Sequence, residues 1–192
     1  MPRCRLLAEV GCDHAKLTAL ALEKGLCCGA IVSDISPVCL KKARRNLCFA
    51  DNVTYLVGDG VVTDGRDPDC VLVCGMGGHA ISGILSRYDG KATLVLSPQS
   101  HTELVRETLV QKGYRLEIDT CFEADGKFYD LLRAVKGERA MDAMQIKYGT
   151  FYKKKNPAAA KRLRRVLGNL NGDPVANARR IAEIMEVLKW QE

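Results

Sequence analysis

Apolar residues in the first two thirds of the chain form short runs that alternate with segments of helical periodicity. The apolar runs have the length of strands and lie at residues 6–10, 29–35, 53–60, 69–78 and 92–98. Apolar residues spaced three or four positions apart predict helices over 15–25, 36–46, 79–88 and 102–113. This alternation predicts an α/β fold with a doubly wound parallel sheet.

The alternation stops at residue 114, where two strand-like runs follow each other directly. They cover residues 114–124 and 127–135, and Asp125-Gly126 separates them. Asp-Gly between two such runs predicts a tight antiparallel hairpin. A parallel sheet that ends in an antiparallel hairpin resembles the Rossmann-like sheet of class I methyltransferases.

The last part of the chain has a different pattern, with two helical segments at 153–170 and 176–190. Gly172 is expected to end the first helix, and Asp173-Pro174 to cap the second. Their apolar positions predict a helical hairpin that buries one face of each helix. These positions are Ala160, Leu163, Val166, Leu167, Leu170, Ile181, Ile184, Met185 and Leu188. We therefore divide the chain into a domain at 1–137 and a helical hairpin or coiled coil at 138–192.

The charge of the 192-residue chain follows the same division. Residues 1–137 hold 17 basic and 17 acidic side chains, and residues 138–192 hold 12 and 6, so the net charge of +6 lies entirely in the second part. A basic appendage on a neutral domain favours an anionic partner such as nucleic acid. A solvated helix face is the simpler alternative for the basic run at 153–165.

Several classes of protein are disfavoured by the composition. No apolar run is long enough to cross a membrane, and no secretory signal is visible, so we expect a cytoplasmic protein, and a monomer. The nine cysteines lack CxxC spacing, and we expect most to be buried and reduced, with no metal bound.

The ends of the predicted strands carry the residue types of a cofactor site. In a parallel sheet, ligands bind beyond the carboxyl ends of the strands. An acid about twenty residues after a glycine loop can hold ribose hydroxyls, and Asp34 lies 23 residues after Gly11. The predicted cofactor-binding residues are Glu9, Gly11, Cys12, His14, Asp34, Ile35, Asp59, Gly60, Gly75, Met76 and Gly77. Alternatively, Glu9 or Asp34 caps the next helix, His14 is exposed at a helix start, and the glycines at 75–78 only form a turn.

The loop after the first strand distinguishes between cofactors. A dinucleotide needs a glycine-rich loop for its pyrophosphate, whereas this loop reads GCDHA and carries Asp13. A carboxylate repels pyrophosphate but not the sulfonium and amino acid portion of S-adenosylmethionine. The loop therefore favours S-adenosylmethionine over a nicotinamide dinucleotide.

Six motifs in this order resemble the bacterial tRNA (adenine(22)-N1)-methyltransferase family. They are AEVGCDHAKL, SDISPVCLKKARRN, VGDG, CGMGGHAI, LSPQS and ADGKFYDLL. The resemblance implies a class I methyltransferase that transfers a methyl group from S-adenosylmethionine to N1 of adenine 22 in tRNA. Two departures from the family are visible: a helix that usually precedes the first strand has no counterpart, and its Gln-Pro-Asn reads Ser97-Pro98-Gln99 here.

The resemblance and the reaction together identify candidate residues. Asp13 is the candidate catalytic carboxylate, because methylation places positive charge on the adenine ring; its alternative role is to cap the following helix. N1 lies on the paired edge of adenine, so the base must be unpaired before it reacts. The predicted substrate-binding residues are Pro98, Gln99, Lys127, Tyr129, Lys154, Lys161, Arg162 and Arg165. Lys127 and Tyr129 are otherwise ordinary strand residues.

Two other functions fit part of the pattern. One is a class I methyltransferase that acts on another RNA or on a small molecule, and the other is an inactive RNA-binding protein with this fold. The acids at 9, 34 and 59 disfavour the inactive protein, and the basic C-terminal segment disfavours a small-molecule substrate.

Overall fold

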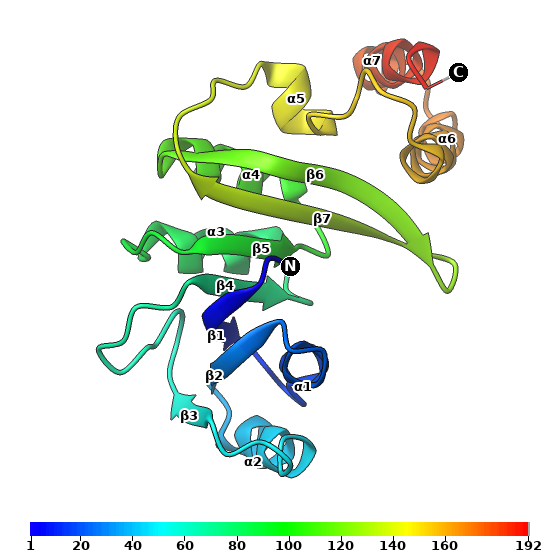
Figure 1. Cartoon of the computed structure of the whole chain (residues 1–192). Coiled ribbons are helices and arrows are strands. Elements are labelled where there is room, and N and C mark those ends of the chain that lie inside the picture. Colours follow the sequence, from blue (N-terminus) through cyan, green and yellow to red (C-terminus); the bar gives the residue numbers. More distant parts are fainter. Residues whose placement is uncertain (192) are drawn as a thin grey trace.

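A single seven-stranded sheet forms the centre of the molecule. The computed structural model describes residues 1–191, and its strands lie in the order β3-β2-β1-β4-β5-β7-β6 (Figure 1). The strands are β1 (Cys4–Val10), β2 (Cys27–Asp34), β3 (Val53–Val57), β4 (Cys70–Cys74), β5 (Thr93–Ser97), β6 (Tyr114–Ala124) and β7 (Lys127–Lys136). Strands β1 to β5 are parallel, and β7 runs antiparallel to both β5 and β6. The predicted class I methyltransferase sheet is confirmed.

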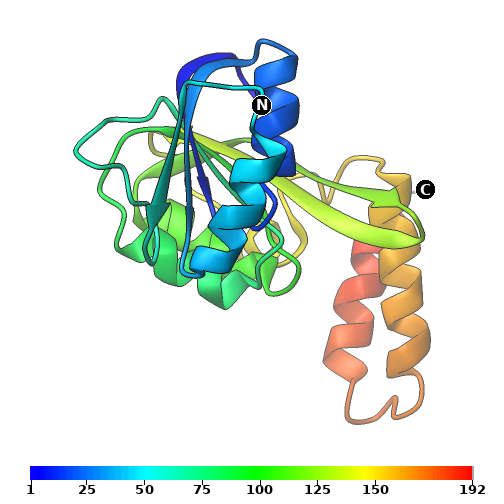
Figure 2. The same ribbon diagram turned by 90° about the horizontal axis from the view of Figure 1, so that it is seen from below.

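Helices lie on both faces of the sheet (Figure 2). Helices α1 (Lys16–Glu23) and α2 (Pro37–Asn46) pack on one face, and α3 (Gly78–Ser86) and α4 (Thr102–Gln111) on the other. Successive residues of a strand point to opposite faces, so Leu7 joins the core beside α1 and Ala8 joins the core beneath α3 and α4. The predicted helix ends are confirmed at Gly25 and Gly113, which adopt φ of +60° and +68°.

The hairpin between β6 and β7 turns where the sequence predicts it. Asp125 and Gly126 both have positive φ, of 50° and 72°, as a two-residue hairpin turn requires. Leu96 near the end of β5 pairs with Leu132, so the first residues of β7 extend past the carboxyl end of β5. The tip of the hairpin therefore projects beyond the edge of the sheet where ligands are expected.

The C-terminal segment contains the predicted pair of helices, α6 (Pro157–Leu170) and α7 (Ala178–Lys189), which lie side by side (Figure 2). A third helix, α5 (Ala143–Tyr148), was missed. Its start has a capping box, in which Asp142 accepts from the Gln145 amide and Gln145 accepts from the Asp142 amide. The spacing Asp-x-x-Gln is the signal in the sequence that would have revealed it.

Helix α6 ends at Leu170 with Asn171 as its C-cap, so Gly172 directly follows the C-cap, as Gly25 and Gly113 do in α1 and α4, and the predicted helix end is confirmed. Two other details predicted for the helical hairpin are wrong. Asp173-Pro174 does not cap α7, which starts after Asn177; Asp173 instead accepts a hydrogen bond from the amide of Ala176 in the connecting turn. Met185 is 52% exposed, and Val187 takes its place on the inner face.

A buried ion pair fixes the segment between the sheet and the helical hairpin. Arg106 of α4 and Asp119 of β6 lie 3.0 Å apart, with side chains only 2% and 0% exposed. Arg106 also donates to the carbonyl of Ile146, and Asp119 accepts from the amide of Thr150. Within residues 1–191, no helix is both long and apolar enough to span a membrane.

Candidate cofactor and substrate site

The carboxyl ends of four neighbouring strands bring the predicted cofactor residues together. Strands β3, β2, β1 and β4 are adjacent, so the loops after them share one edge of the sheet. A first cavity of about 530 Å³ lies there. Its lining includes six predicted residues: Gly11, Asp34, Ile35, Asp59, Gly60 and Met76. Ile35 is 72% exposed at its rim, so an apolar surface is available to a ligand.

The backbone conformation of Gly11 favours glycine, because its φ is +67°. A Cβ atom there would lie 1.8 Å from Cε of Met76, so the flexible end of that side chain would also have to move. The bare backbone of Gly11 forms part of the first cavity and also of a second cavity of about 370 Å³. The two cavities therefore adjoin at this residue.

The second cavity is lined by the GCDHA loop, which occupies the place of a glycine-rich dinucleotide loop. Glu9, Cys12, Asp13, His14 and Gly75 line it together with Gly11. His14 is exposed, which agrees with the alternative predicted for it, although it still borders this cavity. The thiol of Cys12 packs into the core beneath α1 and α2, and burial raises its pKa to about 12.

Glu9 is almost fully buried, at 6% exposure. Its carboxylate accepts hydrogen bonds from the amide and the hydroxyl of Thr18, in the first turn of α1. Burial raises the pKa of Glu9 from 4.5 to about 7, and the bonds from Thr18 only partly oppose this. Glu9 therefore caps α1 from a distance, as its alternative role predicted.

Asp13 has a different environment from Glu9. Helix α1 begins after Ala15, which makes no side-chain cap, so the alternative prediction that Asp13 caps this helix is wrong. The Asp13 carboxylate is exposed and lies 3.0 Å from Nζ of Lys42, which lowers the pKa of Asp13. Its amide donates to Asp34, which fixes the loop against the end of β2.

The two acids of the first cavity have partners that the sequence did not reveal. Asp34 also accepts from the amide of Ser36, the residue that precedes α2. Asp59 makes a bidentate ion pair with Arg87, at 2.9 and 3.0 Å, and Arg87 itself lines the cavity. Arg87 follows α3, 28 residues from Asp59, and no local pattern marks such a pair.

The glycine loop after β4 packs on the loop after β5. The amide of Gln99 donates to the carbonyl of Met76, and the amide of Gly78 donates to the carbonyl of Ser100. A Cβ atom on Gly78 would lie 2.3 Å from the carbonyl oxygen of His101, so the contact requires glycine. Gly77 caps α3 and stays outside the first and second cavities.

An apolar groove of about 490 Å³ adjoins the second cavity at Gly75. Gln99 and Tyr129 line the end of this groove near the strand ends, and Phe122 stacks on Tyr129 with ring centroids 5.5 Å apart. The groove continues along the sheet beside α1 as far as Met1. Pro98 is buried, and Lys127 is exposed beside the hairpin turn.

The predicted basic run is divided in the structure. Lys161 pairs with Glu123 at 2.7 Å and Arg162 with Asp130 at 2.9 Å, so both cations attach α6 to the β6–β7 hairpin. Lys154 and Arg165 are exposed and form no ion pair within residues 1–191. Lys154 and Arg165 therefore remain available to an anionic partner, whereas Lys161 and Arg162 are engaged by acids of the chain itself.

Cysteine burial differs from the prediction. Four of the nine cysteines are buried (Cys12, Cys27, Cys70 and Cys121), and Cys28 and Cys48 are exposed; all nine are free thiols. The part of the chain that the structure describes holds no cluster of three or more side chains arranged as metal ligands.

The comparisons with known proteins identify the family. The family model for TrmK, tRNA (adenine(22)-N(1))-methyltransferase, matches residues 7–184. The chain belongs to this family. A tRNA (adenine(22)-N(1))-methyltransferase of Bacillus subtilis is 31% identical over 159 residues, which span 78% of this chain and 67% of that protein.

Solved structures of similar proteins show the same fold. The crystal structure of B. subtilis TrmK matches with a TM-score of 0.81 at 26% identity, over 99% of this chain and 92% of that chain. A Streptococcus pneumoniae protein crystallised in complex with S-adenosyl-L-methionine matches with a TM-score of 0.89 at 22% identity, over 97% and 94% of the two chains.

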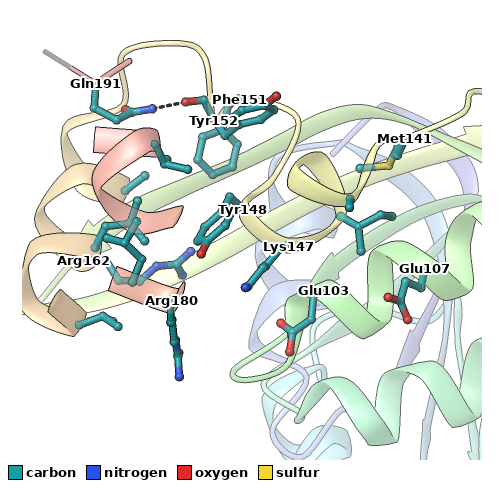
Figure 3. Close-up of a pocket in the computed structure, with 17 residues that line it drawn as sticks. Glu103, Glu107, Met141, Lys147, Tyr148, Phe151, Tyr152, Arg162, Arg180 and Gln191 are labelled. Carbon is teal, nitrogen blue, oxygen red and sulfur yellow. Dashed lines mark hydrogen bonds between the residues drawn. The ribbon is translucent and has the colours of Figure 1, made fainter. Parts of the chain in front are cut away.

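A larger cavity of this TrmK family member lies away from the strand ends. It has about 720 Å³ and is enclosed by α4, α5, α6 and α7 (Figure 3). Glu103 and Glu107 of α4 face it together with Lys147, Arg162 and Arg180. It contains none of the strand-end acids and glycines, so we do not assign the cofactor to it.

Proposed function

We propose that this chain transfers a methyl group from S-adenosylmethionine to N1 of adenine 22 in tRNA. One observation carries the proposal: the first cavity, the second cavity and the apolar groove adjoin one another at the carboxyl ends of the strands. Gly11 lines both the first and the second cavity, and Gly75 lines both the second cavity and the apolar groove. A donor and an acceptor can therefore meet at the second cavity. Membership of the TrmK family supports the choice of reaction and of tRNA.

The residues of the first two cavities fit S-adenosylmethionine. Asp34 and Asp59 provide carboxylate oxygens for ribose hydroxyls and an adenine amino group, and exposed Ile35 provides an apolar surface for the adenine ring. Gly11 and Gly75 allow the backbone to approach the amino acid portion closely, because both have positive φ and no side chain. Glu9 lines the second cavity, and its carboxylate attracts the positively charged groups of S-adenosylmethionine when Glu9 is ionised.

Asp13 is the residue that we propose to act on the acceptor. S-adenosylmethionine supplies a methyl group activated by a sulfonium, and the lone pair of N1 forms the new bond while the sulfur–methyl bond breaks. The positive charge thereby moves from sulfur to the adenine ring. The ionised carboxylate of Asp13, with its lowered pKa, stabilises that charge in the second cavity. Alignment of the two reactants supplies the rest of the acceleration.

Substrate binding is proposed to involve both parts of the chain. Gln99 and Tyr129 at the end of the apolar groove lie where an unpaired adenine enters, and Lys127 is exposed beside the hairpin turn. The segment 138–192 is proposed as a tRNA-binding unit beside the methyltransferase domain at 1–137. We propose that the enzyme acts as a monomer, in the cytoplasm where tRNA is found.

Two variants test the proposed roles separately. We expect Asp34→Ala to weaken S-adenosylmethionine binding about tenfold or more in calorimetry, because a partly buried hydrogen-bond acceptor in the cavity is lost. We expect Asp13→Asn to leave that affinity unchanged and to lower kcat for tRNA by about 100–1,000-fold, the range for loss of one electrostatic group. Asp51→Ala, at an exposed position before β3, is the matched control. Unchanged turnover in Asp13→Asn would contradict the role of Asp13, and absence of cofactor binding in the unaltered protein would contradict the function itself.

A further inference from the structure

Asp130 lies at a buried junction between three elements and has no role in the proposed methyl transfer itself. It belongs to the FYDLL motif, and its side chain is 7% exposed near the middle of β7. A buried carboxylate is costly unless it is paired and hydrogen-bonded. The partners of Asp130 come from three separate parts of the molecule, which are β5, α4 and α6.

Asp130 holds both ends of the loop between β5 and α4. Its backbone carbonyl accepts from the hydroxyl of Ser97 at 2.8 Å, at the end of β5. Its carboxylate accepts from the hydroxyl of Thr102 at 2.6 Å, at the start of α4. The four residues between these two anchors include Gln99, which lines the end of the apolar groove.

The same carboxylate is bound to the helical hairpin. Arg162 of α6 donates to both oxygens of Asp130, at 2.9 Å each. The loop held by Asp130 in turn contacts the glycine loop after β4, through the bonds from Gln99 to Met76 and from Gly78 to Ser100. A continuous series of polar contacts therefore runs from α6 through Asp130 to both loops at the active site.

We propose that Asp130 is a positioning residue that couples the placement of the helical hairpin to the loop presenting Gln99 to the acceptor adenine. This inference rests on the proposed function, because it assigns that loop to the acceptor. Arg162 holds the carboxylate, and the carboxylate holds Thr102. When the hairpin engages tRNA, the loop is kept in the geometry that the transfer requires.

A neighbouring ion pair provides a matched comparison. Lys161 and Glu123 also join α6 to the β6–β7 hairpin, at 2.7 Å, and within residues 1–191 Glu123 forms no hydrogen bond or ion pair with the loop. Both pairs attach the same helix to the same hairpin, but only Asp130 reaches Ser97 and Thr102. Asp130→Asn and Glu123→Gln thus separate loop positioning from simple attachment of α6.

The experiment measures kcat, KM and cofactor affinity with a tRNA transcript that carries adenine at position 22. We expect Asp130→Asn and Thr102→Val to lower kcat about tenfold, the scale of a small misalignment, with tRNA and cofactor affinities unchanged. Thr102→Ser keeps the hydroxyl and should restore kcat, and Glu123→Gln should retain it. Thr102→Val decides the matter if Asp130→Asn fails to fold.

A second readout does not depend on turnover. Amide hydrogen exchange of residues 97–102 should be faster in Asp130→Asn and Thr102→Val than in Glu123→Gln. Normal kcat in both loop variants, or an effect on tRNA affinity alone, would overturn the inference. If the unaltered protein does not methylate tRNA at all, the proposed function fails, and exchange in this loop still tests the junction.

Discussion

Two carboxylates, Glu9 near the end of β1 and Asp13 in the loop that follows, lie four residues apart and have opposite environments. Glu9 is buried and has a raised pKa of about 7, whereas Asp13 is exposed and its pKa is lowered by Lys42. Burial disfavours the charged form of Glu9, and the neighbouring cation favours the charged form of Asp13. At neutral pH, Asp13 is therefore ionised while Glu9 is partly protonated.

The raised pKa of Glu9 predicts a pH-dependent cost to stability. Between pH 4.5 and about 7 the folded protein binds more protons at Glu9 than the unfolded chain does, so Glu9 lowers the free energy of unfolding as pH rises. Glutamine keeps the bonds to Thr18 without a charge. We expect the free energy of unfolding of Glu9→Gln to be about 1–3 kcal/mol higher than that of the unaltered protein at pH 8. Near pH 4.5 the two values should be equal. Denaturant unfolding at both pH values measures this, and a difference that is independent of pH would contradict it.

The sequence predicts which residues meet at the site better than it predicts their partners. Gly11, Asp34 and Asp59 follow strands whose order is set by general rules of α/β folds, so their common location could be inferred. The partners are Lys42 on α2 and Arg87 directly after α3, and nothing in the local pattern distinguishes these two from other surface cations. Such pairs depend on how the helices pack.

At the scale of elements, regular periodicity was predictable and short capped segments were not. Strands β1 to β7 and the longer helices carry enough apolar residues to be seen in the pattern. Helix α5 has no fully buried residue and depends on its capping box, and the start of α7 depends on a turn held by Asp173 and Asn177. Hydrogen bonds, rather than hydrophobic spacing, determine these two boundaries.

Two exposed cations, Lys154 just before α6 and Arg165 within it, give a prediction about tRNA binding. Lys154→Gln combined with Arg165→Gln should weaken tRNA binding and reduce the slope of log affinity against log salt by about 2, because each phosphate contact releases counterions. Cofactor affinity should not change. Lys24→Gln with Arg66→Gln is the matched control. These exposed cations precede β2 and β4, so they lie near the amino ends of the strands, away from the carboxyl ends that form the cavities. An equal effect of the control pair would show that only net charge matters.

At the scale of the whole molecule, the sheet and the helical hairpin meet at one edge. The tip of the β6–β7 hairpin projects past the carboxyl end of β5, and α6 packs against β6 (Figure 2). The ion pairs of Glu123 and Asp130 join the two parts, and Arg106 and Asp119 add hydrogen bonds to Ile146 and Thr150. The exposed cations Lys154 and Arg165 and the cavities are thus held in one connected unit. This arrangement suits a large anionic substrate with one reacting base.

The central claim is that this molecule methylates N1 of adenine 22 in tRNA. The direct measurement is to incubate the protein with S-adenosylmethionine and a tRNA transcript, digest the RNA, and locate the methylated nucleoside by chromatography and mass spectrometry. We predict 1-methyladenosine at position 22, and no product from a transcript with guanine at that position. A methyl group on N6 or at another nucleotide, or no methylation by protein that binds the cofactor, would contradict the account.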